Sequence, residues 1–177
     1  YKRGVLVITS AGNEGIDGDK DGALIHLPSD TPNAMSVSAT APIGWAVNPA
    51  AAFLDFPASY TNYGRSVISV AGPGGDASYP GNENCTVAGL TRPCYVFDFV
   101  FSTGAVVGAS AYYYWSAGTS MAAPHVAGVA ALIVSRFGKM HPSKLRTKLE
   151  RGSDDLGQPG NDPFYGAGRV NAIKSMQ

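Results

Sequence analysis

The sequence predicts an α/β fold with a mainly parallel sheet, and three observations lead to this class. Residues 4–9 form a short, β-branched apolar run that begins at a glycine, which is typical of a buried parallel strand. Residues 120–137 are apolar all round and rich in small side chains, which predicts a helix enclosed on every side. The chain also contains 22 glycines and 12 prolines, so many tight loops should connect its elements.

The other strands follow from local patterns. Residues 35–39 alternate in polarity and predict a second strand, and residues 66–70 predict a third. Residues 72–117 are rich in Gly, Pro and Tyr, which indicates loops and hairpins, with a strand over residues 97–101.

Two further helices are expected after the central one. Residues 142–151 start with a proline and space Leu145 and Leu149 as i and i+4, which predicts a helix. Residues 170–176 predict a short final helix, and residues 1–4 have the pattern of a last helical turn closed by a glycine.

Composition excludes several classes of partner. The 177 residues suffice for one domain or part of one. The net charge is zero, so there is no electrostatic case for a nucleic acid or an anionic membrane. The sequence has no uninterrupted run of about eighteen apolar residues, so no membrane span is expected.

One serine stands at the start of the predicted central helix, in the segment Gly118–Gly128, GTSMAAPHVAG. A hydroxyl at a helix N-terminus lies in a positive local field, which suits a nucleophile whose reaction builds negative charge. Ser120 could instead simply cap the helix. Pro124 is expected within the first turn, where its missing N–H costs nothing.

Residues 118–128 resemble the serine motif of the subtilisin-like serine peptidases, the subtilases. Residues 7–15, VITSAGNEG, resemble the oxyanion-asparagine segment of the same family, and the two motifs occur in the family's order. Three connecting segments also resemble the family, at residues 27–39, 60–72 and 165–172. Residues 1–177 are therefore expected to be the C-terminal part of a single subtilisin-like peptidase domain, with an insertion near residues 76–113.

The resemblance implies a doubly wound, three-layer α/β sandwich and serine endopeptidase activity on peptide or protein substrates. It implies that Ser120 forms an acyl-enzyme, that Asn13 and the Ser120 amide bind the oxyanion, and that catalysis needs no cofactor. Asn13 between a glycine and a glutamate would also suit an ordinary turn. An extracytoplasmic, secreted location is expected.

The resemblance also implies a substrate-binding set. Its members are Ser10, Ala11, Gly12, His26, Gly118 and Thr119. The first three would form one wall of the pocket for the residue before the scissile bond, and His26 would lie at its base. Family members often carry a small residue there, so a histidine would narrow or polarise the pocket, although it could also be an exposed loop residue.

The family's Asp and His motifs have no counterpart in this sequence. Its histidines are His26, His125 and His141. His125 lies five residues beyond Ser120, which on a helix is nearly the opposite side. We therefore expect the triad Asp and His upstream, in a missing N-terminal half, and little peptidase activity from residues 1–177 alone. The alternative is a non-catalytic, peptide-binding pseudo-peptidase. A lipid or ester hydrolase is disfavoured by the lack of a Gly-x-Ser-x-Gly motif.

Three smaller features leave alternatives open. Asp17, Asp19 and Asp21 have the spacing of the first half of a calcium-binding loop. Such a loop needs a glutamate six residues after its glycine, and this chain has Pro28 at that position. A solvated acidic turn is therefore favoured over a structural calcium site. Cys85 and Cys94 could close a small disulfide loop, which would indicate an oxidising compartment, or remain free thiols. Residues 112–115, YYYW, could line peptide subsites or pack under a loop.

Overall fold

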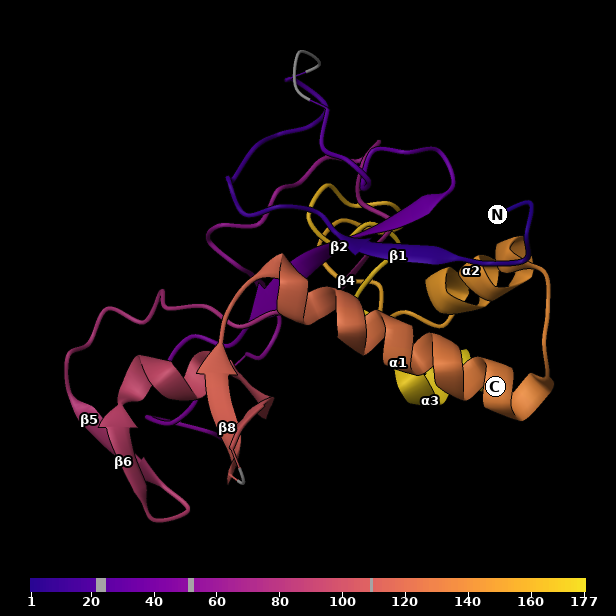
Figure 1. The fold of residues 1–177 in the computed structure, drawn as a ribbon. Helices are drawn as coiled ribbons and strands as arrows, with labels where there is room; N and C mark the ends of the chain where they lie inside the picture. Colours follow the sequence, from indigo (N-terminus) through magenta and orange to yellow (C-terminus); the bar gives the residue numbers. More distant parts are fainter. Residues whose placement is uncertain (22–24, 51–52, 109) are drawn as a thin grey trace.

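A computed structural model describes residues 1–21, 25–50, 53–108 and 110–177. Within them, the central sheet contains four strands: β1 (Val7–Ser10), β2 (Ala34–Ala41), β3 (Phe56–Pro57) and β4 (Val70–Pro73). Strand β2 pairs in parallel with β1 and with β4, and antiparallel with the short β3. The predicted α/β fold with a mainly parallel sheet is therefore confirmed (Figure 1).

The predicted strand boundaries needed two corrections. The strand expected at residues 66–70 begins only at Val70, because residues 64–68 form a turn in which the Ile68 N–H donates to the Gly64 carbonyl at 3.0 Å. The strand expected at residues 97–101 begins only at Val100, because the residues before it belong to a 3-10 helix.

Two antiparallel hairpins and this 3-10 helix lie between β4 and the helices, on one side of the molecule (Figure 1). Their bounds are β5 (Asn84–Val87), β6 (Leu90–Pro93), η1 (Cys94–Asp98), β7 (Val100–Val107) and β8 (Ser110–Ser116). A disulfide joins Cys85 of β5 to Cys94 of η1, so hairpin β5–β6 is covalently tied to the helix that follows it.

The helices are α1 (Thr119–Phe137), α2 (Pro142–Arg151) and α3 (Ala172–Ser175). Helix α1 packs against β1, β2 and β4, and the core between helix and sheet is fully apolar. Met35 and Val37 of β2 are completely buried in it, as are Val126 and Ile133 of α1. This packing fixes the N-terminus of α1 at the carboxyl end of β4, where ligands bind in parallel α/β sheets.

The composition of α1 predicted a helix that is enclosed on every side, but the structure shows that one side is exposed. Leu132 is 46% exposed and Phe137 is 41% exposed, because only one stripe of the helix faces the sheet. The strand predicted to be buried at residues 4–9 is likewise half-exposed, because among the described strands β1 pairs with β2 alone and lies at the sheet edge. By length and composition alone α1 is apolar enough to cross a membrane, a test that core helices also pass.

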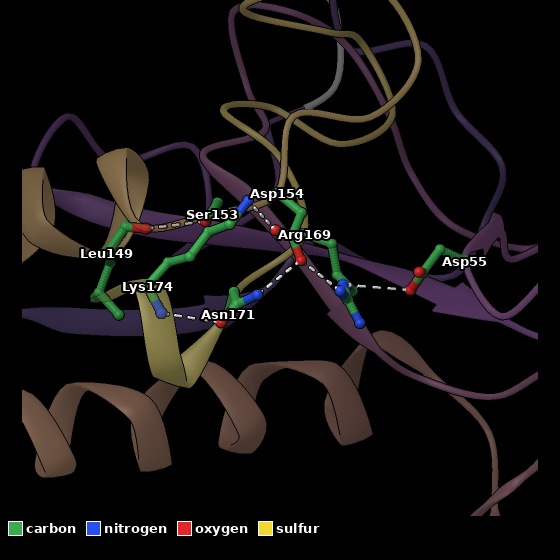
Figure 2. A network of polar contacts seen from close by, with 7 residues as sticks. All are labelled: Asp55, Leu149, Ser153, Asp154, Arg169, Asn171 and Lys174. Carbon is green, nitrogen blue, oxygen red and sulfur yellow. Dashed lines mark hydrogen bonds and ion pairs between the residues drawn. The ribbon is translucent and has the colours of Figure 1, made fainter. Parts of the chain in front are cut away.

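A polar network holds the C-terminal segment against the sheet (Figure 2). The Asp154 carboxylate accepts hydrogen bonds from Arg169 Nη2 at 2.5 Å and from Asn171 Nδ2 at 2.9 Å, and it pairs with Lys174 Nζ at 2.5 Å. Arg169 Nε also lies 3.4 Å from a carboxylate oxygen of Asp55, before β3. The network thus ties α3 to the loop that follows α2 and to the edge of the sheet.

This network predicts a loss of stability in acid. Burial raises the pKa of Asp154, but its bonds from Lys174, Asn171 and Arg169 outweigh burial and lower the pKa from 3.8 to about 2. A carboxyl group whose pKa is lower in the folded state than in the unfolded state stabilises the fold. This stabilisation is complete above the unfolded-state pKa and is lost as the pH falls through the folded-state pKa, here from about 4 towards 2. Asp154→Asn should therefore lower the free energy of unfolding at pH 5 by on the order of 1–2 kcal/mol.

Urea unfolding at pH 5 and at pH 2.5 checks this prediction. The deficit of Asp154→Asn relative to the native chain should shrink at the lower pH. Asp155→Asn, which neutralises the exposed neighbouring carboxylate, should leave the pH dependence in place. An Asp154→Asn deficit that is the same size at both pH values would contradict the assignment.

Candidate active site

A cleft of about 420 Å³ opens at the N-terminus of α1, between that helix and hairpin β7–β8. Ser120, Met121 and His125 line it from the helix, and Phe101 and Tyr114 line it from the hairpin. Strand β8 leads into the start of α1, so the hairpin and the N-terminus of the helix lie next to each other (Figure 1).

Ser120 is exposed in this cleft and does not cap the helix. Gly118 occupies the N-cap position, with no side-chain cap, and Ser120 is the second residue of α1. The capping interpretation is therefore wrong. Pro124 also lies inside the helix, beyond its first turn, and it lacks the N–H that would bond the Ser120 carbonyl four residues earlier.

Asn13 lies on the loop that follows β1, next to the start of α1. The Thr119 N–H donates to Asn13 Oδ1 at 2.9 Å, and the Thr119 hydroxyl donates to the same oxygen at 2.8 Å. A backbone N–H can only donate, so the atom that it meets must be the amide oxygen. The amide Nδ2 is therefore turned away from Thr119, towards Gly118.

Two nitrogen atoms that carry N–H groups lie near the same small space beside Gly118. A β-carbon built on Gly118 would lie 3.7 Å from Asn13 Nδ2 and 3.7 Å from the Ser120 amide nitrogen. The Ser120 N–H belongs to the first turn of α1, where amides have no partner within the helix. The Met121 sulfur lies 3.6 Å from the same point. Two N–H donors that converge beside a nucleophile are the arrangement that stabilises a developing oxyanion.

Gly118→Ala should therefore damage the site in two ways. Gly118 has φ +151°, where side chains are strained by about 1–3 kcal/mol, and the added methyl would occupy the space between the two donors. We expect kcat/KM to fall by about 10²-fold, the scale of one lost oxyanion donor. Gly128→Ala is the matched control on the same helix, because a β-carbon there meets nothing within 4 Å. Peptide hydrolysis kinetics check both variants, and an active Gly118→Ala would contradict the site.

Asn62 organises the loop that carries Asn13, and the sequence did not single it out. Its side-chain oxygen accepts from the Glu14 and Ile16 amides at 3.0 Å, and its Nδ2 donates to the Ala11 carbonyl at 3.0 Å. Asn62 is 5% exposed and fills the space above Gly12, whose φ of +106° admits no side chain easily. In the sequence, Asn62 was marked only by its position within residues 60–72, a segment that resembles the family but to which no role was assigned.

The start of α1 is fixed from the other side by the turn after β4. The Gly118 N–H donates to the Gly74 carbonyl at 2.9 Å, and the Tyr60 hydroxyl donates to the Gly75 carbonyl of the same turn at 2.6 Å. Burial, and then the negative charge of Asp76, raise the pKa of Tyr60 above its ordinary value. Its hydroxyl therefore stays protonated as a donor at neutral pH.

His26 faces inward and is not an exposed loop residue. It lines a small cavity of about 20 Å³ together with Ala11 and Asn62, and the cavity is bounded by Asp21 and Asp30. Within the described residues, His26 Nε2 is buried without a hydrogen-bond partner. The structure therefore brings Ala11 and His26 to one cavity, while Gly12 contacts Thr119 Oγ1 at 3.2 Å through its N–H.

The other histidines do not contact the Ser120 hydroxyl by any described hydrogen bond. His125 lines the same cleft as Ser120, which corrects the expectation that it lies on the opposite side. Its Nδ1 lies 2.8 Å from the Met121 carbonyl, because helical side chains lean towards the N-terminus. His141 is at the N-cap of α2 and accepts from the Ser143 N–H.

The acidic loop does not fit a metal site in the described part of the chain. Asp17 pairs with Lys20 at 3.0 Å, and both Asp19 oxygens accept backbone N–H groups of Arg65 and Ser66. Over the described residues, no three acidic, His or Cys side chains gather as a metal cluster. Gly22, the glycine that ends this acidic segment, lies outside the described residues. The side chains of Asp17 and Asp19 are therefore engaged by Lys20 and by the backbone at residues 65–66.

Hairpin residues 112–115 divide between the two expected roles. Tyr114 lines the cleft with Ser120, whereas Trp115 packs against Phe101 with ring centroids 4.7 Å apart. Within this aromatic run, Tyr114 therefore lines the cleft, and Trp115 packs within the hairpin.

The fold and the cleft together place an exposed serine at a helix N-terminus, with a side-chain amide beside that helix start, on a mainly parallel α/β sheet. Residues 1–168 match the subtilase family, and the chain belongs to that family.

Relatives of known type agree with this family. Serine protease AprX of Bacillus subtilis is 30% identical over 177 residues, which cover 99% of this chain and 36% of that protein. The extracellular serine protease of Serratia marcescens is 48% identical over 54 residues, 30% of this chain and 5% of that protein. A solved lanthipeptide protease has a TM-score of 0.74 and 31% identity, over 99% of this chain and 51% of that one. The chain thus spans little more than a third of AprX.

Proposed function

We propose that residues 1–177 carry the nucleophile and the oxyanion site of a subtilisin-like serine endopeptidase. The observation that carries the proposal is the pair of donors, Asn13 Nδ2 and the Ser120 amide, at equal distances from one point beside Gly118. A hydroxyl that only stabilised structure would not need two free N–H groups next to it.

In this mechanism the Ser120 hydroxyl attacks the peptide carbonyl and forms a tetrahedral intermediate. The carbonyl oxygen becomes an oxyanion held by Asn13 and the Ser120 amide, the amine departs, and water releases the acyl group. A histidine oriented by an aspartate would come from outside residues 1–177; it would take the Ser120 proton during attack and give it to the departing amine. The absence of a described hydrogen bond between Ser120 and any histidine, and the span of the relatives, support that assignment. No cofactor takes part.

Pre-steady-state kinetics with a chromogenic peptide ester test this function. The protein encoded by the whole gene should release one equivalent of leaving group in a burst and then turn over slowly, because an acyl-enzyme accumulates. A linear time course without a burst, together with no covalent intermediate in mass spectra, would exclude acyl transfer on Ser120.

We further propose that His26 limits the pocket for the residue before the scissile bond. A cavity of about 20 Å³ next to Ala11 holds little more than one water. His26→Gly should therefore raise kcat/KM for substrates with Phe relative to Ala at that position, by about tenfold or more. His141→Asn is the control away from the cleft. A peptide-library profile that is unchanged in His26→Gly would reject the role.

A secreted or extracytoplasmic location is proposed on two grounds. Disulfides persist in oxidising compartments, and Cys85 is joined to Cys94. The Serratia relative is itself named an extracellular protease. Neither a nucleic acid nor a membrane is proposed as a partner.

The rival function is a non-catalytic peptide-binding module. It is favoured by one observation, that His125 is the histidine at the cleft and has no described hydrogen bond to Ser120. Such a module would bind peptides without a burst and without covalent labelling, which separates it from the peptidase.

A further inference from the structure

The main chain of Asn13 takes its position from its neighbours. Within the described residues, no hydrogen bond involves the backbone N–H or carbonyl of Asn13. Its side chain meets the start of α1 only through Oδ1, which accepts from the N–H and the hydroxyl of Thr119. The direction of Nδ2, the proposed oxyanion donor, therefore depends on what fixes Gly12 and Glu14, the residues on either side.

One residue, Asn62, holds both of these neighbours. Its backbone N–H donates to the Gly12 carbonyl at 3.1 Å, and its side-chain oxygen accepts from the Glu14 N–H at 3.0 Å. The same side chain also bonds the Ile16 N–H, the Ala11 carbonyl and the Glu14 carboxylate. Both donors and both lone pairs of this buried amide are thereby used, so the amide has one orientation and the loop around it has one position.

Asn62 is in turn anchored to the central sheet. The hydroxyl of the preceding Thr61, which is 2% exposed, accepts from the Ala39 N–H of β2 at 3.0 Å. The Gly15 N–H donates to the Tyr60 carbonyl at 2.9 Å, which adds a second tie between the two segments. A rigid strand is thus connected through Asn62 to the loop that carries the proposed oxyanion donor.

We propose that Asn62 is a positioning residue for the oxyanion donor, because it holds residues 11–16 where Asn13 Nδ2 can reach the substrate oxygen. This role in catalysis rests on the proposed function. The oxyanion exists only during reaction, so a loosened Asn13 should lower kcat and leave KM nearly unchanged. A catalytic group that is misplaced by about 1 Å costs up to about 10²-fold in rate.

A double-mutant cycle tests whether Asn62 acts through Asn13. In the protein encoded by the whole gene, Asn62→Ala should lower kcat by about tenfold to a hundredfold. In an Asn13→Ala background the same substitution should change kcat by no more than about twofold, because the donor that it positions is already gone. An equal loss of kcat in both backgrounds would overturn the proposal, since it would show that Asn62 only stabilises the fold.

Asn161→Ala is the matched control. The Asn161 Nδ2 also links two segments of the chain, by donating to the Arg65 carbonyl at 2.9 Å, but it makes no described bond to residues 11–16. It should retain kcat. Asn62→Asp is the second variant, in case Asn62→Ala does not fold. It keeps the acceptor oxygens and loses both N–H donors, so it should show the same dependence on Asn13.

Amide hydrogen exchange separates this proposal from the proposed function. The Thr119 N–H donates to Asn13 Oδ1, so its exchange reports on the position of Asn13 whether or not peptides are cleaved. Asn62→Ala or Asn62→Asp should speed this exchange by about tenfold or more relative to the buried Ile133 in α1. Faster Thr119 exchange in a protein that does not hydrolyse peptides would support the positioning role and refute the peptidase. Hydrolysis by a protein whose Thr119 exchange ignores both variants would support the peptidase and refute the positioning role.

Discussion

Replacing Ser120 with alanine should lower kcat by about 10⁶-fold, the scale observed when the nucleophile of subtilisin is removed. The reason is that Ser120 is exposed in the cleft and its hydroxyl is the group proposed to bond to the substrate carbon. The measurement is peptide hydrolysis by the protein encoded by the whole gene, with thermal unfolding to show that the variant folds.

Ser116→Ala is the matched control for this prediction, because it removes another serine hydroxyl from the lining of the same cleft. It should retain activity within about tenfold. Residual hydrolysis by Ser120→Ala above that of Asn13→Ala would contradict nucleophilic catalysis by Ser120.

Replacing Asn13 with alanine should lower kcat by about 10²–10³-fold, with little change in KM, the magnitude known for the corresponding donor of subtilisin. The carbonyl oxygen of a substrate becomes an oxyanion only during reaction, so the missing Nδ2 affects the transition state more than binding. Steady-state kinetics on a peptide substrate give both constants.

Asn13→Asp distinguishes a donor from a positioning residue. The aspartate would still accept from the Thr119 N–H and hydroxyl, so the loop should keep its place, but it would have no amide to donate. We expect kcat to fall at least as far as in Asn13→Ala. Recovery of activity in Asn13→Asp would mean that Asn13 only holds the loop.

The sequence predicted the parts of the fold that local patterns determine. Helix α2 was predicted with its observed bounds, because a proline start and an i, i+4 leucine pair act within one helix. The two motifs around Asn13 and Ser120 were likewise readable, since each is a contiguous run. The geometry that joins them depends on contacts between residues 106 apart in the sequence, which no local pattern contains.

The errors arose where tertiary contacts override local composition. The apolar helix expected at residues 120–137 was predicted to be enclosed, but how many of its sides are covered depends on which elements pack against it. The position of His125 was predicted from helical spacing alone. In the structure its ring leans towards the Met121 carbonyl, and the side chain therefore reaches the cleft. Asn62 has an ordinary local sequence, and its role follows from five contacts with a loop distant in the chain.

Covalent labelling tests the central claim most directly. A fluorophosphonate probe is applied to the protein encoded by the whole gene, and peptide mass spectrometry locates the adduct. We expect a single adduct on Ser120, slowed in Asn13→Ala and lost when the protein is first blocked with a peptide aldehyde, because an activated serine and its oxyanion site react together. An unlabelled Ser120 in folded, peptide-binding protein would contradict the peptidase and leave the binding module in its place.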